Sequence, residues 1–259
     1  MHPIITTELV KELRDATGIS IMQCKRALVE AEGDMKKALA ILKKTSGDIA
    51  LKKADRETKD GRVCIKTGSG KSVLLALHCE TDFVARNEDF VNLLSRLADM
   101  ALVDGIEKMK MAAKDMIDPV IQKTGENIEL GKVYEVMGDT LGNYVHNDKI
   151  AIIVSLEGGN RELAKDIAMH VAAMKPEYIS LEEINEEAKK LVTEIFQKEV
   201  ASLDKPPEIK KKMLDGKIAT YFKEKTLLNQ PFIKNADETI EMLLNKSKAK
   251  IKEIKSYSI

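Results

Sequence analysis

The sequence has few of the residues that build disulfide frameworks, zinc sites or nucleic-acid-binding surfaces. Its 259 residues include three cysteines and four histidines, and its 42 basic side chains are matched by 42 acidic ones. Three scattered cysteines are too few for a disulfide framework, and none shows the paired Cys-x-x-Cys spacing of a zinc site. Zero net charge argues against nucleic acid as a partner, because binding to phosphates needs a surplus of basic side chains.

Long apolar runs are also missing. No stretch reaches the roughly 18 apolar residues that a membrane span requires, and the start at Met1–Ile4 lacks the basic and apolar segments of a secretory signal. We therefore expect a cytoplasmic protein with reduced thiols and no membrane partner. His78 and Cys79 could be read as a metal pair, but neighbouring strand residues point to opposite faces, so we expect no metal site.

Signals of catalysis and of nucleotide binding are weak as well. None of the four histidines has a nucleophile at the spacing of a known triad, and no pair of carboxylates stands out. Gly70-Lys71-Ser72 matches the end of a phosphate-binding loop, but Ile65 stands where that loop requires glycine. The segment also leads into a predicted strand, which leaves no helix amino terminus for a phosphate. We expect no catalytic residues, no cofactor and no enzyme activity.

The sequence does contain a succession of helical and strand-like patterns. Residues 1–45 predict a bundle of three helices, with helical apolar spacing over 9–13, 21–31 and 35–42 and glycines at the two turns. Residues 46–60 are polar and indicate a linker, which leaves room for a short helical segment.

Two later segments each predict a β-hairpin followed by a helix. In residues 61–141, apolar residues alternate on both sides of a turn signal at 67–70, and a helical stripe runs from Phe90 to Met100. Residues 142–180, completed by 230–259, repeat this order. The expected fold class is α+β, with two related core subdomains in which helices cover small sheets.

Residues 181–229, inserted into the second segment, predict an antiparallel coiled-coil hairpin. Apolar residues step by three and four along its first half, and Pro206-Pro207 marks the turn. The predicted seam consists of Leu181, Ile184, Ala188, Leu191 and Ile195, with Leu214, Ile218, Tyr221 and Leu228 on the returning helix. The alternative is a pair of ordinary core helices, but lysine-rich flanks favour a solvated arm.

The heptapeptide at 81–87, Thr-Asp-Phe-Val-Ala-Arg-Asn, lies between a predicted strand and a predicted helix. Asn87 suits the cap of that helix, and Phe83 falls outside its apolar stripe. In one interpretation, Phe83 packs back on the first helical turn and Asp82 complements the helix dipole. In the other, the strand holds an acidic residue and an aromatic ring as a rigid wedge in front of a partner.

Residues 79–87 resemble a signature of the elongation factor Ts family, the nucleotide-exchange factors of the translational GTPase elongation factor Tu. Further segments resemble other motifs of this family in the same order, at 9–34, at 167–173 with Pro176, and at 230–232. The resemblance implies an amino-terminal domain like a ubiquitin-associated domain, two core subdomains and a coiled-coil hairpin.

The resemblance also implies a function, because a member of this family binds elongation factor Tu with GDP and promotes GDP release. Asp82 and Phe83 would enter the GTPase near its magnesium and nucleotide site. The implied partner contacts are Thr81, Asp82, Phe83 and Val84, together with Met22, Arg86, Asn87 and His170. An alternative of a different class is a helical adaptor or chaperone-like scaffold without exchange activity, which the terminal bundle and the arm would favour.

Structural roles compete with some of these contacts. Met22 could fill the core of the bundle, and His170 could be a satisfied core histidine, although the resemblance implies that it faces the partner. Arg86 could pair with Asp82 or Asp89 of its own segment. A measurement of whether the chain speeds nucleotide release from a GTPase would distinguish an exchange factor from an adaptor.

Overall fold

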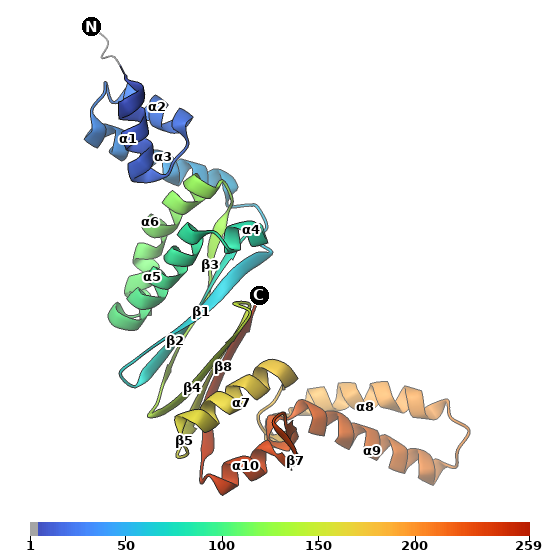
Figure 1. Cartoon of the computed structure of the whole chain (residues 1–259). Coiled ribbons are helices and arrows are strands. Elements are labelled where there is room, and N and C mark those ends of the chain that lie inside the picture. The colour runs from blue at the N-terminus through green and yellow to red at the C-terminus, as the bar shows by residue number, and fades with distance from the viewer. Residues whose placement is uncertain (1–4) are drawn as a thin grey trace. The chain divides into compact units, whose positions relative to one another are not determined.

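A computed structural model describes residues 5–259, which fold into ten α-helices, two short 3-10 helices and eight strands (Figure 1). The strands form three small sheets, with the orders β1-β2-β3, β4-β5-β8 and β6-β7. This confirms the predicted mixture of helices and small sheets, while the division into four domains and one linker stays a prediction. The chain divides into two compact units, the first comprising residues up to 136 with 145–151 and 256–259, and the second comprising 137–144 and 152–255.

The first unit begins with three helices that pack around a small core of their own. They are α1 (Thr7–Thr17), α2 (Ile21–Glu30) and α3 (Met35–Lys53). A polar side chain before each helix accepts a hydrogen bond from its first turn, namely Thr6, Ser20 and Asp34. Gly18 ends α1 at a φ of 67°, a left-handed conformation that glycine adopts without strain. Leu13 and Leu28 are fully buried in this core.

Helix α3 extends well past its predicted end at Leu42. Its second half runs through the segment that was expected to begin the linker, and it ends at Lys53. The reason is burial, because Ser46 is buried and Ala50 belongs to the core of the following sheet and helices. One helix thus contributes to two apolar cores, which the polar composition of residues 46–60 does not reveal.

The rest of the first unit is a sheet with two long helices on one face (Figure 1). Its elements are β1 (Asp60–Gly68), β2 (Lys71–Cys79), α4 (Asp82–Ala85), α5 (Glu88–Asp104), α6 (Ile106–Thr124) and β3 (Ile128–Met137). β1 and β2 are antiparallel, and Ser69-Gly70 connects them with Gly70 at a φ of 71°, as the turn signal predicts. The apolar stripe predicted for α5 is confirmed, since Phe90, Leu93 and Leu97 are buried in the core.

The second unit repeats the order of hairpin and helix. The elements that lie wholly or mostly in it, outside the hairpin of helices, are β4 (Thr140–His146), β5 (Ile150–Glu157), α7 (Arg161–Met174), β6 (Pro231–Phe232), β7 (Asn235–Thr239), α10 (Ile240–Lys246) and β8 (Lys250–Ser258). The end of β4, the start of β5 and the end of β8 belong to the first unit. Helix α7 approaches β4 closely at Gly142, where a Cβ atom would collide with the backbone of Ala164. That the two sheet-plus-helix segments are related stays a prediction.

Two helices of the second unit lie side by side as a helical hairpin (Figure 1). They are α8 (Glu186–Ala201) and α9 (Pro207–Lys225), and the turn predicted at Pro206-Pro207 is confirmed, since α9 begins at Pro207. Leu181 lies before α8 in a 3-10 turn (Leu181–Glu183) and is exposed, whereas Ile184 is buried. No helix within residues 5–259 is both long enough and apolar enough to span a membrane.

The predicted seam on α8 is wrong in part. Leu191 and Ile195 are 60% and 56% exposed, whereas their neighbour Val192 is buried. The stripe that contains Val192 also contains Phe196, whose ring meets that of Tyr221 edge-on with centroids 5.9 Å apart. An aromatic pair buries more apolar area than two aliphatic side chains, so this stripe faces α9 and the other is left in solvent.

Candidate functional site

The heptapeptide at 81–87 forms the short helix α4 and the cap of α5. The Thr81 side chain accepts a hydrogen bond from the backbone N–H of Val84 at 3.4 Å and caps α4. Val84 itself is buried in the core. Asn87 accepts a hydrogen bond from the backbone N–H of Asp89 at 2.9 Å, which confirms it as the cap of α5. The backbone of this segment is therefore held at both ends.

Phe83 points away from the core that holds its neighbours. It is 83% exposed, so the interpretation in which it packs back on the first helical turn is wrong. Leaving a phenylalanine in water forgoes the roughly 1.5 to 3 kcal/mol that its burial contributes. Helix α4, which carries the ring, has only four residues and is held at both ends by the caps at Thr81 and Asn87. We call Asp82 and Phe83 on this helix the wedge.

The carboxylate of the wedge pairs with the cation one helical turn away. Nη2 of Arg86 lies 3.1 Å from Oδ2 of Asp82, so the structural role predicted for Arg86 is confirmed. The Asp82 side chain is half-exposed and that of Arg86 is exposed. An exposed pair of this kind contributes little to stability, so both groups can exchange this contact for one with a partner.

The strand that leads into the wedge carries the two residues considered as a metal pair. Sγ of Cys79 donates to the carbonyl of Thr81 at 3.1 Å, and burial raises the pKa of Cys79 to about 12, so its thiol stays neutral. Nε2 of His78 lies 2.9 Å from the hydroxyl of Tyr257. The two side chains thus have separate partners, and residues 5–259 contain no group of three His, Cys, Asp or Glu side chains placed to hold a metal ion.

Glu126, which no motif marks, lies in the loop between α6 and β3 and contacts the residues that precede α4. Its Oε2 accepts hydrogen bonds from the backbone N–H groups of Glu80 at 3.1 Å and Thr81 at 3.0 Å. Its Oε1 accepts a third from the Thr81 hydroxyl at 2.6 Å. No spacing rule links residues so far apart in the chain, and the nearest local signal is Gly125, which ends α6 at a φ of 80°.

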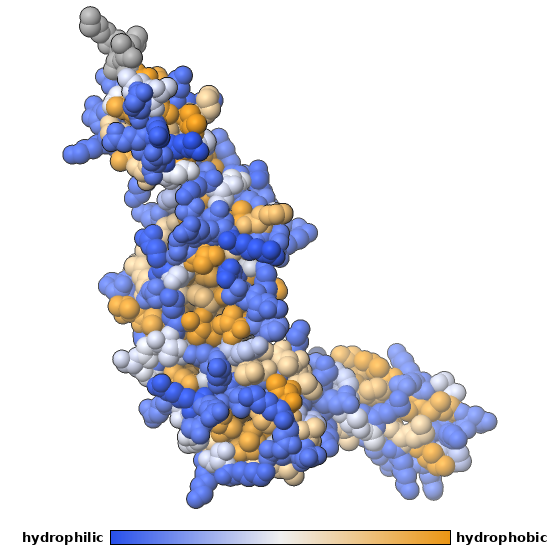
Figure 2. Space-filling model, in the orientation of Figure 1, coloured by the Kyte–Doolittle hydropathy of each residue, from blue (hydrophilic) through white to orange (hydrophobic). Residues whose placement is uncertain are grey.

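Met22 lies on the outer face of α2 and is 60% exposed, so the alternative that it fills the core of the bundle is wrong. Ile21 and Val29 are exposed on the same helix. Met22 and Val29 line a shallow groove together with Lys25 and Arg26. Figure 2 shows apolar surface among hydrophilic surface over these amino-terminal helices. Because Glu30 also lines this groove, the surface suits a partner that combines apolar and charged side chains.

His170, in α7 of the second unit, is fully buried, with an exposed fraction of 0%. Its Nδ1 accepts a hydrogen bond from the backbone N–H of Ile233 at 3.3 Å, and its Nε2 lies 2.9 Å from Oε1 of Gln230. Because Nδ1 accepts, the proton of the neutral ring is on Nε2. Burial lowers the pKa of His170 although the bond to Gln230 raises it. The structure corrects the expected surface position, and we leave His170 out of the proposed contacts.

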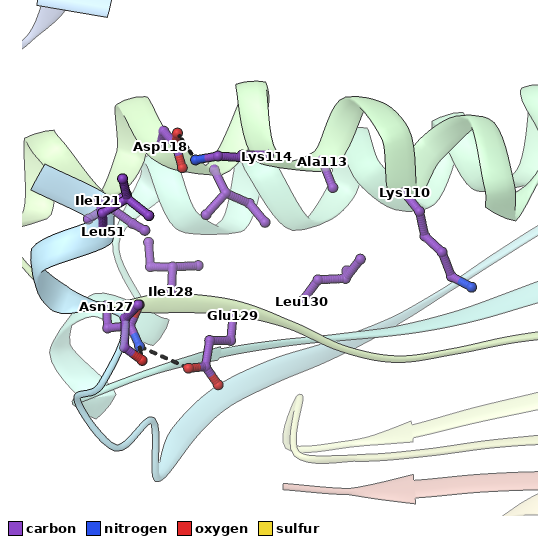
Figure 3. A pocket seen from close by; sticks show the side chains of 13 residues that line it. Leu51, Lys110, Ala113, Lys114, Asp118, Ile121, Asn127, Ile128, Glu129 and Leu130 are labelled. Carbon is purple, nitrogen blue, oxygen red and sulfur yellow. Dashed lines mark hydrogen bonds and ion pairs between the residues drawn. The ribbon is translucent and has the colours of Figure 1, made fainter. Parts of the chain in front are cut away.

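A groove of the first unit lies between α3, α6 and β3 (Figure 3). Leu51, Ile121 and Leu130 contribute to its mainly apolar lining. Four of its polar residues pair with one another, Lys114 with Asp118 at 2.6 Å and Asn127 with Glu129 at 2.9 Å. Lys110, which also lines the groove, pairs with Glu107 outside it at 3.0 Å. These groups are already engaged, so the groove presents an apolar surface and not a set of reactive side chains.

Comparison with known proteins finds relatives over nearly the whole chain. Residues 80–259 match the protein family described as elongation factor TS, and the match begins next to Thr81. Proteins named elongation factor Ts from Hahella chejuensis and Nitrosospira multiformis are each 39% identical over 98% of this chain, covering 92% and 90% of their own lengths. Elongation factor Ts from Marinobacter nauticus is 40% identical over 93% of this chain and 86% of its own length.

Proposed function

The chain belongs to the elongation factor Ts family of translation elongation factors, and we propose that it binds elongation factor Tu with GDP and promotes GDP release. In this proposal it works in the cytoplasm by binding alone, without bond chemistry, cofactor or metal of its own. The proposed partner contacts are Thr81, Asp82 and Phe83, with Met22, Arg86 and Asn87 as further contacts. Val84, which was also expected to face the partner, is buried in the core and is left out.

The observation that carries this proposal is the exposed ring of Phe83 beside the carboxylate of Asp82 on an anchored helix. We propose that both side chains enter the GTPase near its magnesium ion and nucleotide. An aromatic ring needs space, so its entry displaces residues that line the nucleotide pocket. The pocket then holds GDP less tightly.

The wedge alone cannot supply the whole effect. Accelerating release by about 10⁴ requires roughly 5.5 kcal/mol, at about 1.36 kcal/mol for each factor of ten. Burying one phenylalanine supplies only about 1.5 to 3 kcal/mol. The remainder must come from contacts that form better when the nucleotide pocket is distorted. By linkage, GDP weakens binding of the factor by the same free energy by which the factor weakens binding of GDP.

Further surfaces can supply those contacts. We propose that α1 to α3 act as a ubiquitin-associated-like domain, that the sheets with their helices form two related core subdomains, and that α8 and α9 form a coiled-coil arm. Exposed apolar residues on α2 and α8, such as Met22 and Leu191, support a contact surface that is distributed along the chain.

Replacement of Phe83 by alanine tests the proposal. Because the ring is exposed, Phe83→Ala should leave the melting temperature nearly unchanged. It should slow release of a fluorescent GDP from elongation factor Tu, followed by stopped flow, by about one to two orders of magnitude, equal to roughly 1.4 to 2.7 kcal/mol.

Two control variants bracket this result. Val103→Ala removes another exposed apolar side chain and should change neither melting nor release. Phe90→Ala truncates a fully buried ring and should cost about 3 to 5 kcal/mol of stability. If the unaltered chain bound the GTPase but left GDP release at its spontaneous rate, the adaptor alternative would replace this proposal.

A further inference from the structure

The wedge stands on a helix that cannot hold its own position. Helix α4 has four residues, which is one turn, and a single turn is unstable without tertiary support. A ring that is pushed into a folded GTPase also meets resistance. If α4 moved under this resistance, the ring would move with it and the nucleotide pocket would not be distorted. What holds α4 from behind therefore matters for exchange.

Glu126 supplies that support from the loop after α6. Both of its carboxylate oxygens are used, Oε2 by the backbone N–H groups of Glu80 and Thr81 and Oε1 by the Thr81 hydroxyl. A hydroxyl has one proton, and donating it to Glu126 leaves its lone pairs free to accept from the backbone N–H of Val84. Glu126 thus orients the side chain that caps α4.

The contact between the two loops is reciprocal. While Glu126 accepts from the backbone of the loop before α4, Oε1 of Glu80 accepts from the backbone N–H of Asn127 at 2.6 Å. Nη1 of Arg56 lies 3.4 Å from the same oxygen of Glu80. Hydrogen bonds that end on a charged oxygen are stronger than neutral ones. We call Glu80, Thr81, Glu126 and Asn127 the loop clamp.

We infer that Glu126 is a positioning residue for nucleotide exchange, which keeps α4 in place while Phe83 enters the GTPase. This inference rests on the proposed function, because it assigns the residue that makes the wedge rigid. Glu126 is half-buried behind α4 and acts through Thr81 and the backbone, so it need not touch the partner.

A double-mutant cycle between Glu126 and Phe83 tests the inference. Glu126→Ala should slow stimulated GDP release at saturating factor by about tenfold, equal to about 1.4 kcal/mol. In a Phe83→Ala background, the same change should slow release by no more than about twofold, because there is no ring left to position. A general loss of stability would lower release by the same factor in both backgrounds.

A second variant guards against misfolding. In Glu126→Gln, the amide oxygen can still accept from both backbone N–H groups, but the NH₂ group meets the Thr81 hydroxyl and reverses that hydrogen bond. This variant should keep the wild-type melting temperature, and its release rate should fall between those of wild type and Glu126→Ala. Glu135→Gln is the matched control, because Glu135 is a half-buried carboxylate of β3 whose partner, Lys71, lies away from α4.

The outcomes separate this inference from the proposed function. If Phe83→Ala itself leaves release unchanged, the proposed wedge is wrong. If Phe83→Ala slows release but the effects of Glu126→Ala and Phe83→Ala multiply in full, the wedge stands and the positioning role is overturned. Equal effects of Glu126→Gln and Glu135→Gln on release would also overturn it.

Discussion

At the scale of single residues, exposure separates Phe83 from His170, although both lie in segments that resemble motifs of one family. Phe83 is exposed and its backbone neighbours are hydrogen-bonded, which suits a side chain that acts on a partner. His170 is buried, and both of its ring nitrogens have hydrogen-bond partners inside the second unit. A buried, hydrogen-bonded histidine such as His170 contributes to the stability of the fold. Because a histidine can bind a proton, this contribution to the free energy of unfolding depends on pH.

We expect His170 to make the chain less stable in mild acid. Burial holds its pKa below the ordinary value of about 6.5, so in this range the unfolded chain binds a proton that the folded chain does not. The stability that the neutral ring contributes is complete above about pH 6.5. It is lost as the pH falls from there through the lowered pKa of the folded state.

Thermal melts at a series of pH values between about 7.5 and 5 check this expectation. The melting temperature of His170→Gln should depend less steeply on pH than that of wild type, even though the variant is less stable at neutral pH. His146→Gln, which replaces an exposed histidine, is the matched control. Parallel slopes for wild type and His170→Gln would contradict the assignment.

At the scale of helices and strands, packing decides which of several apolar faces is used. Helix α8 offers two stripes, and its neighbour α9 covers the one with Val192 and Phe196. The stripe with Leu191 and Ile195 is left exposed, and Figure 2 shows apolar surface over the hairpin helices. Exposed apolar side chains on a solvated hairpin are available for contacts with another protein.

Alanine substitutions on α8 distinguish the two stripes. Val192→Ala should destabilise the hairpin by about 1 to 3 kcal/mol, because it removes a buried side chain and leaves a cavity. Leu191→Ala removes a larger side chain but should change stability by no more than about 0.5 kcal/mol, because that side chain is mostly in water. Hydrogen exchange of the amides of α8 and α9 measures both changes locally. Equal losses of stability in Val192→Ala and Leu191→Ala would contradict this assignment and support the seam that the sequence pattern predicts.

At the scale of the whole molecule, we expect the chain to bind a protein and no nucleotide. The segment that resembles the end of a phosphate-binding loop is the turn of the β1–β2 hairpin. Lys71 pairs with Glu135 of β3 at 3.1 Å, and Ser72 is buried. Helices α5 and α6 come later in the chain, and the turn itself leads into β2, so it does not run into a helix amino terminus as a phosphate-binding loop does.

The isolated chain should therefore bind no GDP and hydrolyse no GTP. Equilibrium dialysis with labelled GDP should detect no complex at micromolar concentrations, and Lys71→Ala should behave like wild type. Elongation factor Tu in a parallel cell is the positive control. Saturable micromolar binding of GDP that is lost in Lys71→Ala would show that the chain has a nucleotide site of its own.

The sequence by itself determined the local features of this protein. The cap at Asn87, the turn at Ser69-Gly70 and the apolar stripe of α5 were predictable, because each depends on residues within one or two turns of the chain. The succession of hairpin and helix in each half follows from the same kind of signal, whereas α6, β3 and α10 were not predicted. The succession of four motifs was also sufficient to predict the family, which the comparisons confirm.

Only the tertiary structure decided the features that depend on distant residues. The exposure of Phe83, the burial of His170, the covered face of α8 and the support from Glu126 are of this kind. An apolar side chain is exposed or buried according to what packs on it, and a hydrogen bond across a fold leaves no periodicity in the sequence. For the same reason α3 runs beyond its predicted end, since its last turns gain their stability from a core formed by residues that follow much later in the chain.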